Sequence, residues 1–473
     1  MSNWQVPGYL QQVDGRLHMD GIDVSSLAKR YGTPLFVFSE KRIRHNVAQV
    51  QEAFHNSHVQ TRIFYASKAN SNLAVLQILR STGIDIEVNS GGELYKALQA
   101  GFQPDQIIFN GVAKTEDEIA EAIRNRIFSL NVDSATELQR VLKVSQALGM
   151  PARVKLRMVP EIRTGSHGGL QTGTHESKFG ISENELLDCY REVLANSVNF
   201  TLVGLHMHIG SQTPDARKYK TALEVLLTRA ADLHAQTGFL VPYINIGGGI
   251  PVPYLKPDNE AHGLTAELFG ILSASTPPSE IANFTVGQLG QNGFWESLGG
   301  ETQVLRNSLQ QMGVLVEPGR YIAADTAVLL AEVQNSKVRP GSNDAWLMID
   351  AGFNTLLEAF DYNWYFHAIH ASNEGKSLRP FKLAGPLCDS GDEFLDSERL
   401  DRLPNYRMLS EGAKVGDLLA FLDTGAYTLE QMSQYNGQRR AAAVMIRLSG
   451  EVQVIRKRDS YEDLLSHDLP LET

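Results

Sequence analysis

The sequence predicts an α/β protein that consists of a TIM (β/α)8 barrel followed by a C-terminal β-rich, Greek-key-like barrel domain. Short apolar runs alternate with helical patterns through the first two thirds of the chain, and this alternation is typical of a parallel sheet. After about residue 321 the pattern changes to β-rich segments. A chain of 473 residues with 42% hydrophobic content is long enough for two or three domains.

Eight apolar runs are the expected barrel strands. They cover residues 62–66, 84–88, 106–110, 128–132, 153–158, 203–208, 243–246 and 313–316. About eight parallel strands, each followed by a helix, is the strand count of a TIM barrel. Capping-box motifs begin at Thr115, Ser134 and Ser182 between these runs, and such motifs mark helix starts.

The same pattern divides the chain into three parts. We expect residues 1–34 to pack on the β domain, residues 35–320 to form the barrel, and residues 321–473 to form the β domain. The stretch 257–310 exceeds an ordinary βα unit, and loops longer than about fifteen residues are commonly lids or binding elements. We therefore expect an insertion that shapes the substrate site.

Charge and composition point to a small-molecule substrate. Lys+Arg total 43 against Asp+Glu 54, a net charge of -11, which argues against nucleic acid and anionic membranes as partners. The sequence shows neither a signal-peptide pattern nor a long apolar run, so we expect a cytoplasmic protein. Two cysteines, Cys189 and Cys388, predict no structural disulfide, and metal-ligand patterns are not apparent.

Lys68 is the residue on which the functional interpretation depends. It follows the first barrel run directly, and an amine at the end of a strand can form a Schiff base with an aldehyde cofactor. The other runs also end in polar or glycine-rich clusters. Active sites of TIM barrels form at these carboxyl ends of the strands, although most lysines are simply solvated surface charges.

Glycines after the last two runs predict a phosphate site. Gly247, Gly248 and Gly249 follow the seventh run, and Gly319 and Arg320 follow the eighth, where this fold commonly binds phosphate. Glycine lets amide protons approach phosphate oxygens closely, and arginine adds a planar charged fork. Taken alone, three glycines would more often mark a tight turn.

Eight motifs occur in order along nearly the whole chain. They are Tyr65–Lys68, Asn89–Leu94, Ser177–Gly180, His206–Ser211, Gly247–Gly249, Glu317–Arg320, Cys388–Asp392 and Gly425–Tyr427. This ordered set resembles the fold type III pyridoxal-phosphate decarboxylases, which include the diaminopimelate, ornithine and arginine decarboxylases, with alanine racemase as a more distant relative. The resemblance implies a carboxy-lyase in lysine biosynthesis or in a diamine or siderophore-type pathway.

The resemblance also implies roles for the matching residues. Lys68 would hold pyridoxal phosphate as an internal aldimine, His208 would stack on its ring, and Glu317 would face the pyridine nitrogen. The other implied cofactor contacts are Glu87, Arg157, Ser211, Gly247, Gly248, Gly249, Gly319, Arg320 and Tyr427. Glu87 and Arg157 would equally suit an ion pair at the barrel end, and for His206 a structural role is as compatible as a ligand role.

Glu317 favours decarboxylation over racemisation. Loss of CO2 leaves two electrons at Cα, and a protonated ring nitrogen makes the cofactor a strong electron sink. A carboxylate keeps that proton in place, whereas racemases of this fold put an arginine at the nitrogen. The alternatives are a racemase-like enzyme and a non-catalytic pyridoxal-phosphate-binding protein, although the latter resembles the barrel alone.

Cys388 matches a family cysteine that comes from the partner subunit and returns a proton to the carbanion. The resemblance therefore implies a homodimer whose active sites are shared across the interface. A small buried apolar thiol is the alternative for a lone cysteine.

Substrate choice is where the sequence departs from the diaminopimelate enzymes. Those usually carry an arginine shortly after the equivalent of residues 350–352, and a glutamate at the position of Asp389, but no arginine lies between Arg339 and Arg379 here. An arginine fork is the natural partner of a distal carboxylate. The expected substrate contacts are Asp389, Arg320, Asp361 and Tyr365. The carboxylates of Asp389 and Asp361 would suit a distal ammonium, as in lysine or ornithine. The alternative is that they are solvated surface groups.

Overall fold

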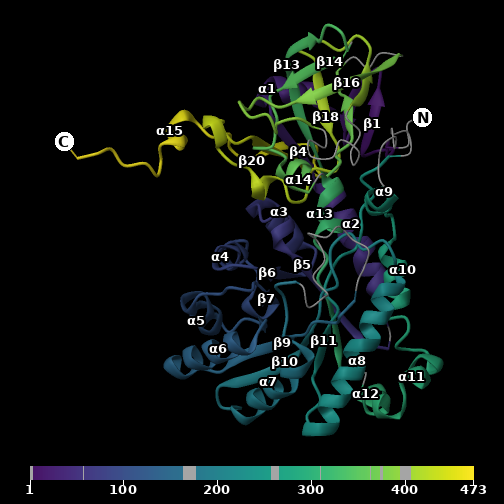
Figure 1. The fold of residues 1–473 in the computed structure, drawn as a ribbon, viewed down its shortest axis with the longest axis vertical. Coiled ribbons are helices and arrows are strands. Elements are labelled where there is room, and N and C mark those ends of the chain that lie inside the picture. Colours follow the sequence, from purple (N-terminus) through teal and green to yellow (C-terminus); the bar gives the residue numbers. More distant parts are fainter. Residues whose placement is uncertain are drawn as a thin grey trace. The chain divides into compact units, whose positions relative to one another are not determined.

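The computed structural model (Figure 1) describes residues 4–56, 58–162, 177–256, 266–308, 311–342, 344–362, 364–372, 377–394 and 406–472. It divides into two compact units. We call residues 45–251 and 274–322 the barrel unit, and residues 1–44, 252–273 and 323–473 the β unit.

The barrel unit contains a closed barrel of eight parallel strands, so the TIM barrel prediction is confirmed. The strands are β5 (Gln60–Ala66), β6 (Asp85–Val88), β7 (Ile107–Phe109), β8 (Ser129–Val132), β9 (Ala152–Arg157), β10 (Phe200–His206), β11 (Tyr243–Asn245) and β12 (Gly313–Val316). Each pairs with the next, and β12 closes onto β5 with Gly313 opposite Gln60. Every predicted run overlaps one strand.

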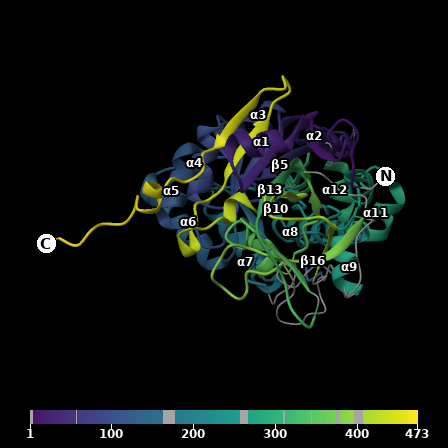
Figure 2. The ribbon, with the colours of Figure 1, turned by 90° about the horizontal axis from the view of Figure 1, so that it is seen from above.

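Helices lie around the outside of the barrel (Figures 1 and 2); the first of them precedes β5, and each of the others follows a barrel strand. They are α2 (Glu40–Phe54), α3 (Leu73–Ser81), α4 (Gly91–Gln99), α5 (Glu116–Asn125), α6 (Ala135–Leu148), α7 (Glu183–Ala195) and α8 (Arg217–Thr237). Inside the barrel, a cluster of buried apolar side chains fills the centre. It consists of Phe64, Ile108, Phe128, Val203 and Leu315.

Only one of the three predicted capping boxes is complete. At α5, Thr115 and Glu118 satisfy each other's backbone amides. At α6, Ser134 accepts from the amide of Glu137, but the Glu137 carboxylate turns to the amide of Asp133 at 2.8 Å. At α7 the motif makes no backbone cap, because the Ser182 hydroxyl donates to the carboxylate three residues later.

The β unit is built on a large sheet. Its strands are β4 (Leu35–Ser39), β13 (Ala327–Val338), β14 (Ala345–Ile349), β15 (Ala368–His370), β16 (Leu378–Ala384), β17 (Arg407–Ser410), β18 (Leu418–Phe421), β19 (Ala442–Ile446) and β20 (Val452–Arg456). A separate sheet of β1 (Leu10–Val13), β2 (Arg16–Met19) and β3 (Ile22–Asp23) precedes α1 (Val24–Tyr31). Side chains from this N-terminal segment, including Trp4 and Leu17, share one apolar cluster with the large sheet.

The predicted start of the barrel at residue 35 is wrong, because β4 belongs to the β unit. This strand pairs antiparallel with β13 and parallel with β19. All five of its residues are buried. An apolar run without alternation fits a barrel strand and a central strand of another sheet equally well, so only the pairing distinguishes the two.

The expected insertion is helical where it is described. Its helices are α9 (Ala266–Leu272) in the β unit, and α10 (Pro278–Phe284), α11 (Asn292–Leu298) and α12 (Gln303–Ser308) in the barrel unit. Helices α10 and α12 pack against α8. Thr276 donates to the carbonyl of Pro214 at 3.0 Å, three residues after Ser211, so this segment reaches the expected phosphate loop. Its substrate-shaping role stays a prediction.

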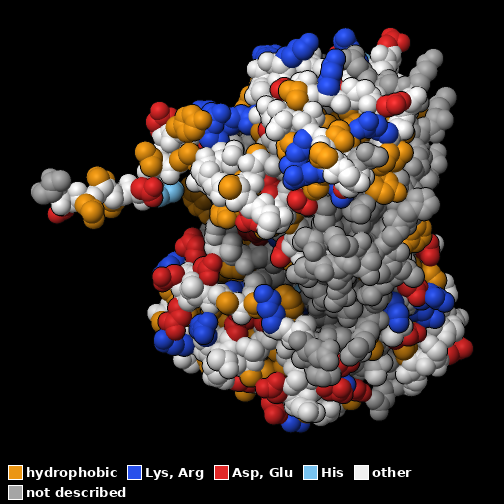
Figure 3. Space-filling view, turned by 45° about the horizontal axis from the view of Figure 1, so that its top comes forward, with side chains coloured by type: hydrophobic (Ala, Val, Ile, Leu, Met, Phe, Trp, Pro, Cys, Tyr) orange, Lys and Arg blue, Asp and Glu red, His pale blue; other side chains and the backbone are white. Residues whose placement is uncertain are grey.

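Surface chemistry is mixed on the face shown in Figure 3, where basic and acidic side chains are interspersed. Both cysteines are free thiols: Cys189 is buried on α7 and Cys388 is exposed in a loop. Among the described helices, none combines the length and the apolar character that crossing a membrane requires.

We predict that Leu35→Ala lowers the free energy of unfolding by about 2–5 kcal/mol, because it leaves a cavity in the fully buried core of the β unit. Urea unfolding of the variant beside the wild type measures this. The control is Leu448→Ala at a side chain that is 62% exposed, which should change stability by less than about 0.5 kcal/mol. Equal effects of the two substitutions would contradict the core position of β4.

Candidate active site

A layer of buried polar side chains lies at the carboxyl ends of the barrel strands. Its members are Glu87, Asn110, Asn131, Arg157, His206, Asn245 and Glu317. Asn110 follows β7 and Glu317 follows β12, two strands that are not neighbours, yet a hydrogen bond of 3.1 Å joins their side chains. That bond must therefore cross the interior of the barrel, which places the layer inside it.

Glu317 is the centre of this layer. The Asn245 carboxamide donates to one of its oxygens at 2.7 Å, and the Asn110 carboxamide donates to the other. His206 Nε2 lies 3.4 Å from the second oxygen. Asn131 donates both to the Asn110 carboxamide oxygen and to His206 Nδ1, the latter at 3.1 Å. With Nδ1 accepting the hydrogen bond from Asn131, the neutral imidazole carries its proton on Nε2, the nitrogen that faces Glu317.

Glu317 is held in its ionised form. Burial acts to raise the pKa of this carboxyl, but His206, Lys155 and the hydrogen bond from Asn245 outweigh burial and hold the pKa well below its ordinary value. Burial also lowers the pKa of His206 to about 4, so this imidazole is neutral at neutral pH. A neutral donor and a charged acceptor thus face each other.

Glu87 has the opposite protonation state. Burial raises the pKa of Glu87 to about 8, Glu317 adds to the shift, and Lys68 opposes it. Neither carboxyl oxygen makes a well-aligned hydrogen bond within the described part of the chain. At neutral pH the layer therefore contains one ionised carboxylate, Glu317, and one protonated carboxyl group, Glu87. Different environments commonly separate the pKa values of two acids in one site in this way.

The triglycine brings the loop after β11 against two other loops. Gly248 donates its amide to His208 Nδ1 at 3.1 Å. A Cβ at Gly247, where φ is +70°, would lie 2.7 Å from the same nitrogen, and a Cβ at Gly248 would lie 2.1 Å from the carbonyl oxygen of Glu317. Close backbone approach therefore requires both glycines. Burial within the site lowers the pKa of His208, so its imidazole is neutral too.

Arg320 and Ser211, two of the expected phosphate contacts, lie next to each other. Arg320 is buried and its Nε donates to the Ser211 hydroxyl at 3.3 Å. Gly319, just before Arg320, lets the loop approach β5 closely, because a Cβ at this position would lie 3.0 Å from the Cβ of Ala66. The loop after β12 is thereby drawn against the end of β5, where Lys68 stands.

Lys68 is exposed, in a short 3-10 turn (Ser67–Ala69) at the end of β5. Its charge acts on both Glu87 and His208, so the amine lies beside the polar layer. The preceding Ser67 donates to Glu93 at 2.6 Å, which fixes the turn to the start of α4. The amine is thus held at the mouth of the barrel, where a ligand can reach it.

Arg157 takes part in an ion pair at the barrel end. Its guanidinium lies 3.6 Å from the Asp133 carboxylate and 4.3 Å from the centre of the Phe179 ring. This geometry matches the ion-pair interpretation of Arg157. A cofactor contact for it stays a prediction.

The remaining expected site residues belong to the β unit. Cys388 is exposed, and Asp389 accepts hydrogen bonds from Gly391 N at 2.9 Å and from the Tyr435 hydroxyl at 3.2 Å. Asp361 is exposed at the end of α14 (Leu357–Asp361), and Tyr427 has a left-handed backbone with φ of 55°. Tyr365 is a core residue of this unit, buried with the Arg407 guanidinium 4.5 Å from its ring.

Four polar residues of the barrel interior received no role from the sequence. Asn110 and Asn131 were visible as polar residues at strand ends, but Asn245 and Lys155 were not singled out. Period-two alternation could have found Lys155, because it stands two residues before Arg157 on β9 and so faces the same side.

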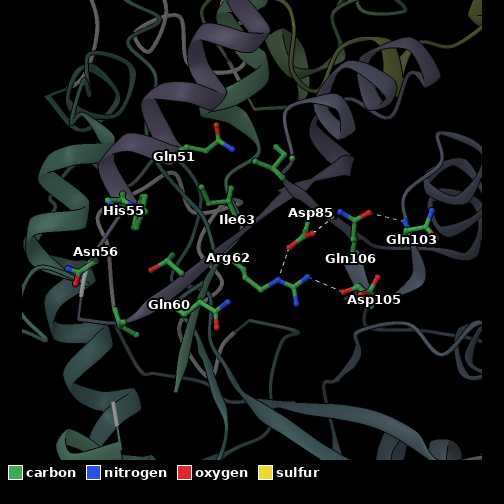
Figure 4. Close-up of a pocket in the computed structure, with 15 residues that line it drawn as sticks. Gln51, His55, Asn56, Gln60, Arg62, Ile63, Asp85, Gln103, Asp105 and Gln106 are labelled. Carbon is green, nitrogen blue, oxygen red and sulfur yellow. Dashed lines mark hydrogen bonds and ion pairs between the residues drawn. The ribbon is translucent and has the colours of Figure 1, made fainter. Parts of the chain in front are cut away.

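A separate cavity of about 840 Å³ opens at the amino ends of β5 and β6 (Figure 4). Arg62 pairs with Asp85 at 2.8 Å, Gln106 donates to the same carboxylate at 3.2 Å, and the Arg62 guanidinium stacks 4.5 Å from the Phe128 ring. These groups satisfy one another. At the amino ends of the strands such an arrangement indicates a role in stability, because TIM barrel sites form at the other end.

Comparison with known proteins identifies the family. Residues 40–284 match the family model "Pyridoxal-dependent decarboxylase, pyridoxal binding domain". The chain is 34% identical over 452 residues to diaminopimelate decarboxylase of Methanothermobacter thermautotrophicus, a match that covers 95% of both proteins. The chain belongs to the pyridoxal-dependent decarboxylases. This pyridoxal-dependent decarboxylase is also 32% identical to diaminopimelate decarboxylase of Aquifex aeolicus, over 98% of both.

Solved structures agree with the family. The crystal structure of diaminopimelate decarboxylase from M. jannaschii in co-complex with L-lysine aligns with a TM-score of 0.82 at 30% identity, over 98% of both chains. The predicted cofactor, pyridoxal phosphate, and the predicted reaction class, decarboxylation, are confirmed. The residues present fit that cofactor: an exposed amine, a buried ionised carboxylate and a Ser–Arg pair lie around one barrel mouth.

We predict that Glu87→Gln changes how stability depends on pH in the cofactor-free decarboxylase. Because the folded pKa of about 8 exceeds the ordinary 4.5, this carboxyl contributes stability that is full below about pH 4.5 and is lost as the pH rises through 8. The wild type should therefore lose about 2–4 kcal/mol relative to the variant between pH 5 and pH 8.

Urea unfolding at the two pH values measures this loss. Glu121→Gln, which removes an exposed carboxylate with 55% side-chain exposure, is the matched control and should show no such divergence. Parallel stability curves for wild type and Glu87→Gln would show that Glu87 is ionised throughout.

Proposed function

We propose that this enzyme removes CO2 from the α-carbon of a diamino acid, with diaminopimelate as the first candidate substrate. The observation that carries the proposal is Glu317, a buried and ionised carboxylate with a donor on each oxygen, at the carboxyl end of the barrel that also presents Lys68. Relatives along the full chain that are named diaminopimelate decarboxylases support the substrate.

Lysine or ornithine, as the L or D isomer, is the second candidate. The segment between Arg339 and Arg379 offers no arginine for a distal carboxylate, and Asp389 and Asp361 would instead suit a distal ammonium. The exposed positions of Cys388 and Asp361 leave both side chains accessible. A buried Tyr365 is the weakest of the proposed substrate contacts.

Different residues of the barrel unit would serve different steps of the reaction. Bound pyridoxal phosphate supplies the electron sink that accepts the electron pair left at Cα. Lys68 is placed to bind the cofactor aldehyde covalently. Glu317 would hold a proton on the ring nitrogen, and Asn245 and Asn110 fix the orientation of that carboxylate. The neutral His208 imidazole would lie against the ring.

Arg320 and Ser211 would bind the phosphate, helped by the glycine loops that let backbone amides approach it. Gly249, Gly319 and Tyr427 are the further phosphate contacts that we propose. After CO2 leaves, the Cys388 thiol would return a proton to Cα. The family resemblance implies that this thiol comes from a second copy of the chain, so we propose a homodimer with shared active sites.

Substrate turnover tests the proposal directly. The holoenzyme is incubated with meso-diaminopimelate and with both enantiomers of lysine, ornithine and arginine, while CO2 is trapped and product chirality is followed. We expect CO2 from diaminopimelate or from one basic diamino acid, and none from Lys68→Ala, because that variant lacks the amine. Scrambled chirality without CO2 would show a racemase, and cofactor binding without turnover would show a non-catalytic protein.

Subunit mixing tests the shared site. Lys68→Ala and Cys388→Ala proteins should each be strongly impaired, but co-refolded mixtures should recover up to about a quarter of wild-type activity, because half of the dimers are mixed and each mixed dimer has one intact site. Recovery is measured as CO2 release per active-site equivalent. Activity that never exceeds the mean of the two variants would show that each subunit completes its own site.

A further inference from the structure

The sequence motif that begins at Cys388 ends in a second acidic residue, Asp392, to which the proposed function gives no role. Asp392 is only 2% exposed, although Cys388, four residues earlier, is exposed. A buried carboxylate is costly unless hydrogen-bond donors surround it. The donors that meet Asp392 therefore indicate what this side chain does.

Two backbone amides each donate to one oxygen of this carboxylate. Phe353 donates its amide to Oδ1 of Asp392, and Leu387 donates its amide to Oδ2, both at 2.8 Å. Leu387 directly precedes Cys388 in the segment 385–392, which we call the Cys388 loop, whereas Phe353 lies in the loop after β14. The carboxylate of Asp392 thus joins two loops of the β unit.

Two glycines make room for the carboxylate. A Cβ at Gly352 would lie 2.3 Å from Oδ1 of Asp392, and a Cβ at Gly385 would lie 2.2 Å from Oδ2. A side chain at either position would therefore displace the carboxylate from its two amides. Gly385 also donates its amide to the carbonyl oxygen of Asp392 at 2.9 Å. The first and last residues of the Cys388 loop are thus held together, with the thiol between them.

A second side chain holds the next amide of the Cys388 loop. The Oδ1 atom of Asn436 accepts a hydrogen bond from the amide of Cys388 at 2.7 Å. Asn436 itself has a left-handed backbone with φ of 56°, a conformation that glycine adopts without strain. The consecutive amides of Leu387 and Cys388 are therefore both fixed by side chains, and this limits rotation of the backbone that carries the thiol.

We propose that Asp392 is a positioning residue that fixes the Cys388 loop and thereby directs the Cys388 thiol at the α-carbon, with Asn436 as a second support. The inference rests on the proposed role of Cys388. In that step the S–H bond breaks, the electron pair that CO2 leaves at Cα forms the new C–H bond, and the thiolate regains a proton from water. Displacement of a reacting group by about 1 Å can cost about a hundredfold in rate.

Hydrogen exchange tests the contact itself. Asp392→Ala removes both acceptors, so we expect backbone exchange at Leu387 and at Phe353 to become at least about tenfold faster. Mass spectrometry of peptic fragments measures this in the cofactor-free protein. The matched control is Asp417→Ala, which removes another buried carboxylate of the β unit that accepts a loop amide, from Lys414 at 2.9 Å. It should leave exchange at Leu387 and Phe353 unchanged.

The products test the position of the thiol. A turnover in which Cα receives no proton releases CO2 but no amine, and this ratio does not depend on how tightly the substrate binds. The wild-type holoenzyme and Asp417→Ala should form equal amounts of amine and CO2. Asp392→Ala should form less amine than CO2, with kcat lowered at least about tenfold. Its affinity for pyridoxal phosphate should stay within about threefold of the wild type, because the proposed phosphate contacts lie outside the Cys388 loop.

Unchanged exchange at Leu387, or equal amounts of amine and CO2, in Asp392→Ala would overturn the inference, and so would the same loss in Asp417→Ala. Should Asp392→Ala not fold, Asn436→Gly decides, because it keeps the left-handed backbone and removes only the acceptor of the Cys388 amide. We then expect faster exchange at Cys388 and less amine than CO2, and the absence of either would overturn the inference. A wild type that releases no CO2 would instead contradict the proposed function.

Discussion

The hydrogen bonds on Glu317 are the constraint on which this site depends. A carboxylate inside a protein is costly unless donors surround it, and here the donors come from Asn110 and Asn245, which lie 207 and 72 residues away in the sequence. Asn245 stands on β11, the direct neighbour of β12, but Asn110 follows β7 and meets Glu317 because the sheet closes into a barrel. Barrel closure and the charge of Glu317 are therefore not separable properties: the fold supplies the donors, and the donors make the buried charge tolerable.

This constraint also sets the character of the neighbouring groups. With one negative charge already fixed, a second carboxylate in the same low-dielectric space is disfavoured, and Glu87 accordingly keeps its proton at neutral pH. The two imidazoles, His206 and His208, stay neutral for a related reason, since burial penalises their cationic forms. Glu317 is thus the one anion of the layer, while Glu87 and the imidazole of His206 are uncharged and Arg157 is paired with Asp133.

Much of this arrangement could be predicted from the sequence, because short local patterns determine it. Apolar runs predicted the eight strands, and the residues just after them singled out Lys68 and Arg320, whereas the roles of His208 and Glu317 came from the family resemblance. The sequence could not predict the features that depend on which strands pair. The run 35–39 looks like any buried strand until its partners β13 and β19 are known. Asn245 has no signature beyond its position, and the incomplete capping motifs depend on where a carboxylate finds a better donor.

The triglycine shows how one motif can have two physical meanings. The sequence indicates a phosphate-binding loop, which needs exposed amides. In the structure the Gly248 amide is already used by His208, and a Cβ at Gly248 or Gly249 would lie 2.1 or 2.2 Å from the carbonyl oxygens of Glu317 and Gly210. Any side chain at Gly248 would push directly on the backbone of Glu317. Gly248 therefore positions the acid as well as the loop, whereas a side chain at Gly249 would press on Gly210, next to Ser211 of the expected phosphate loop.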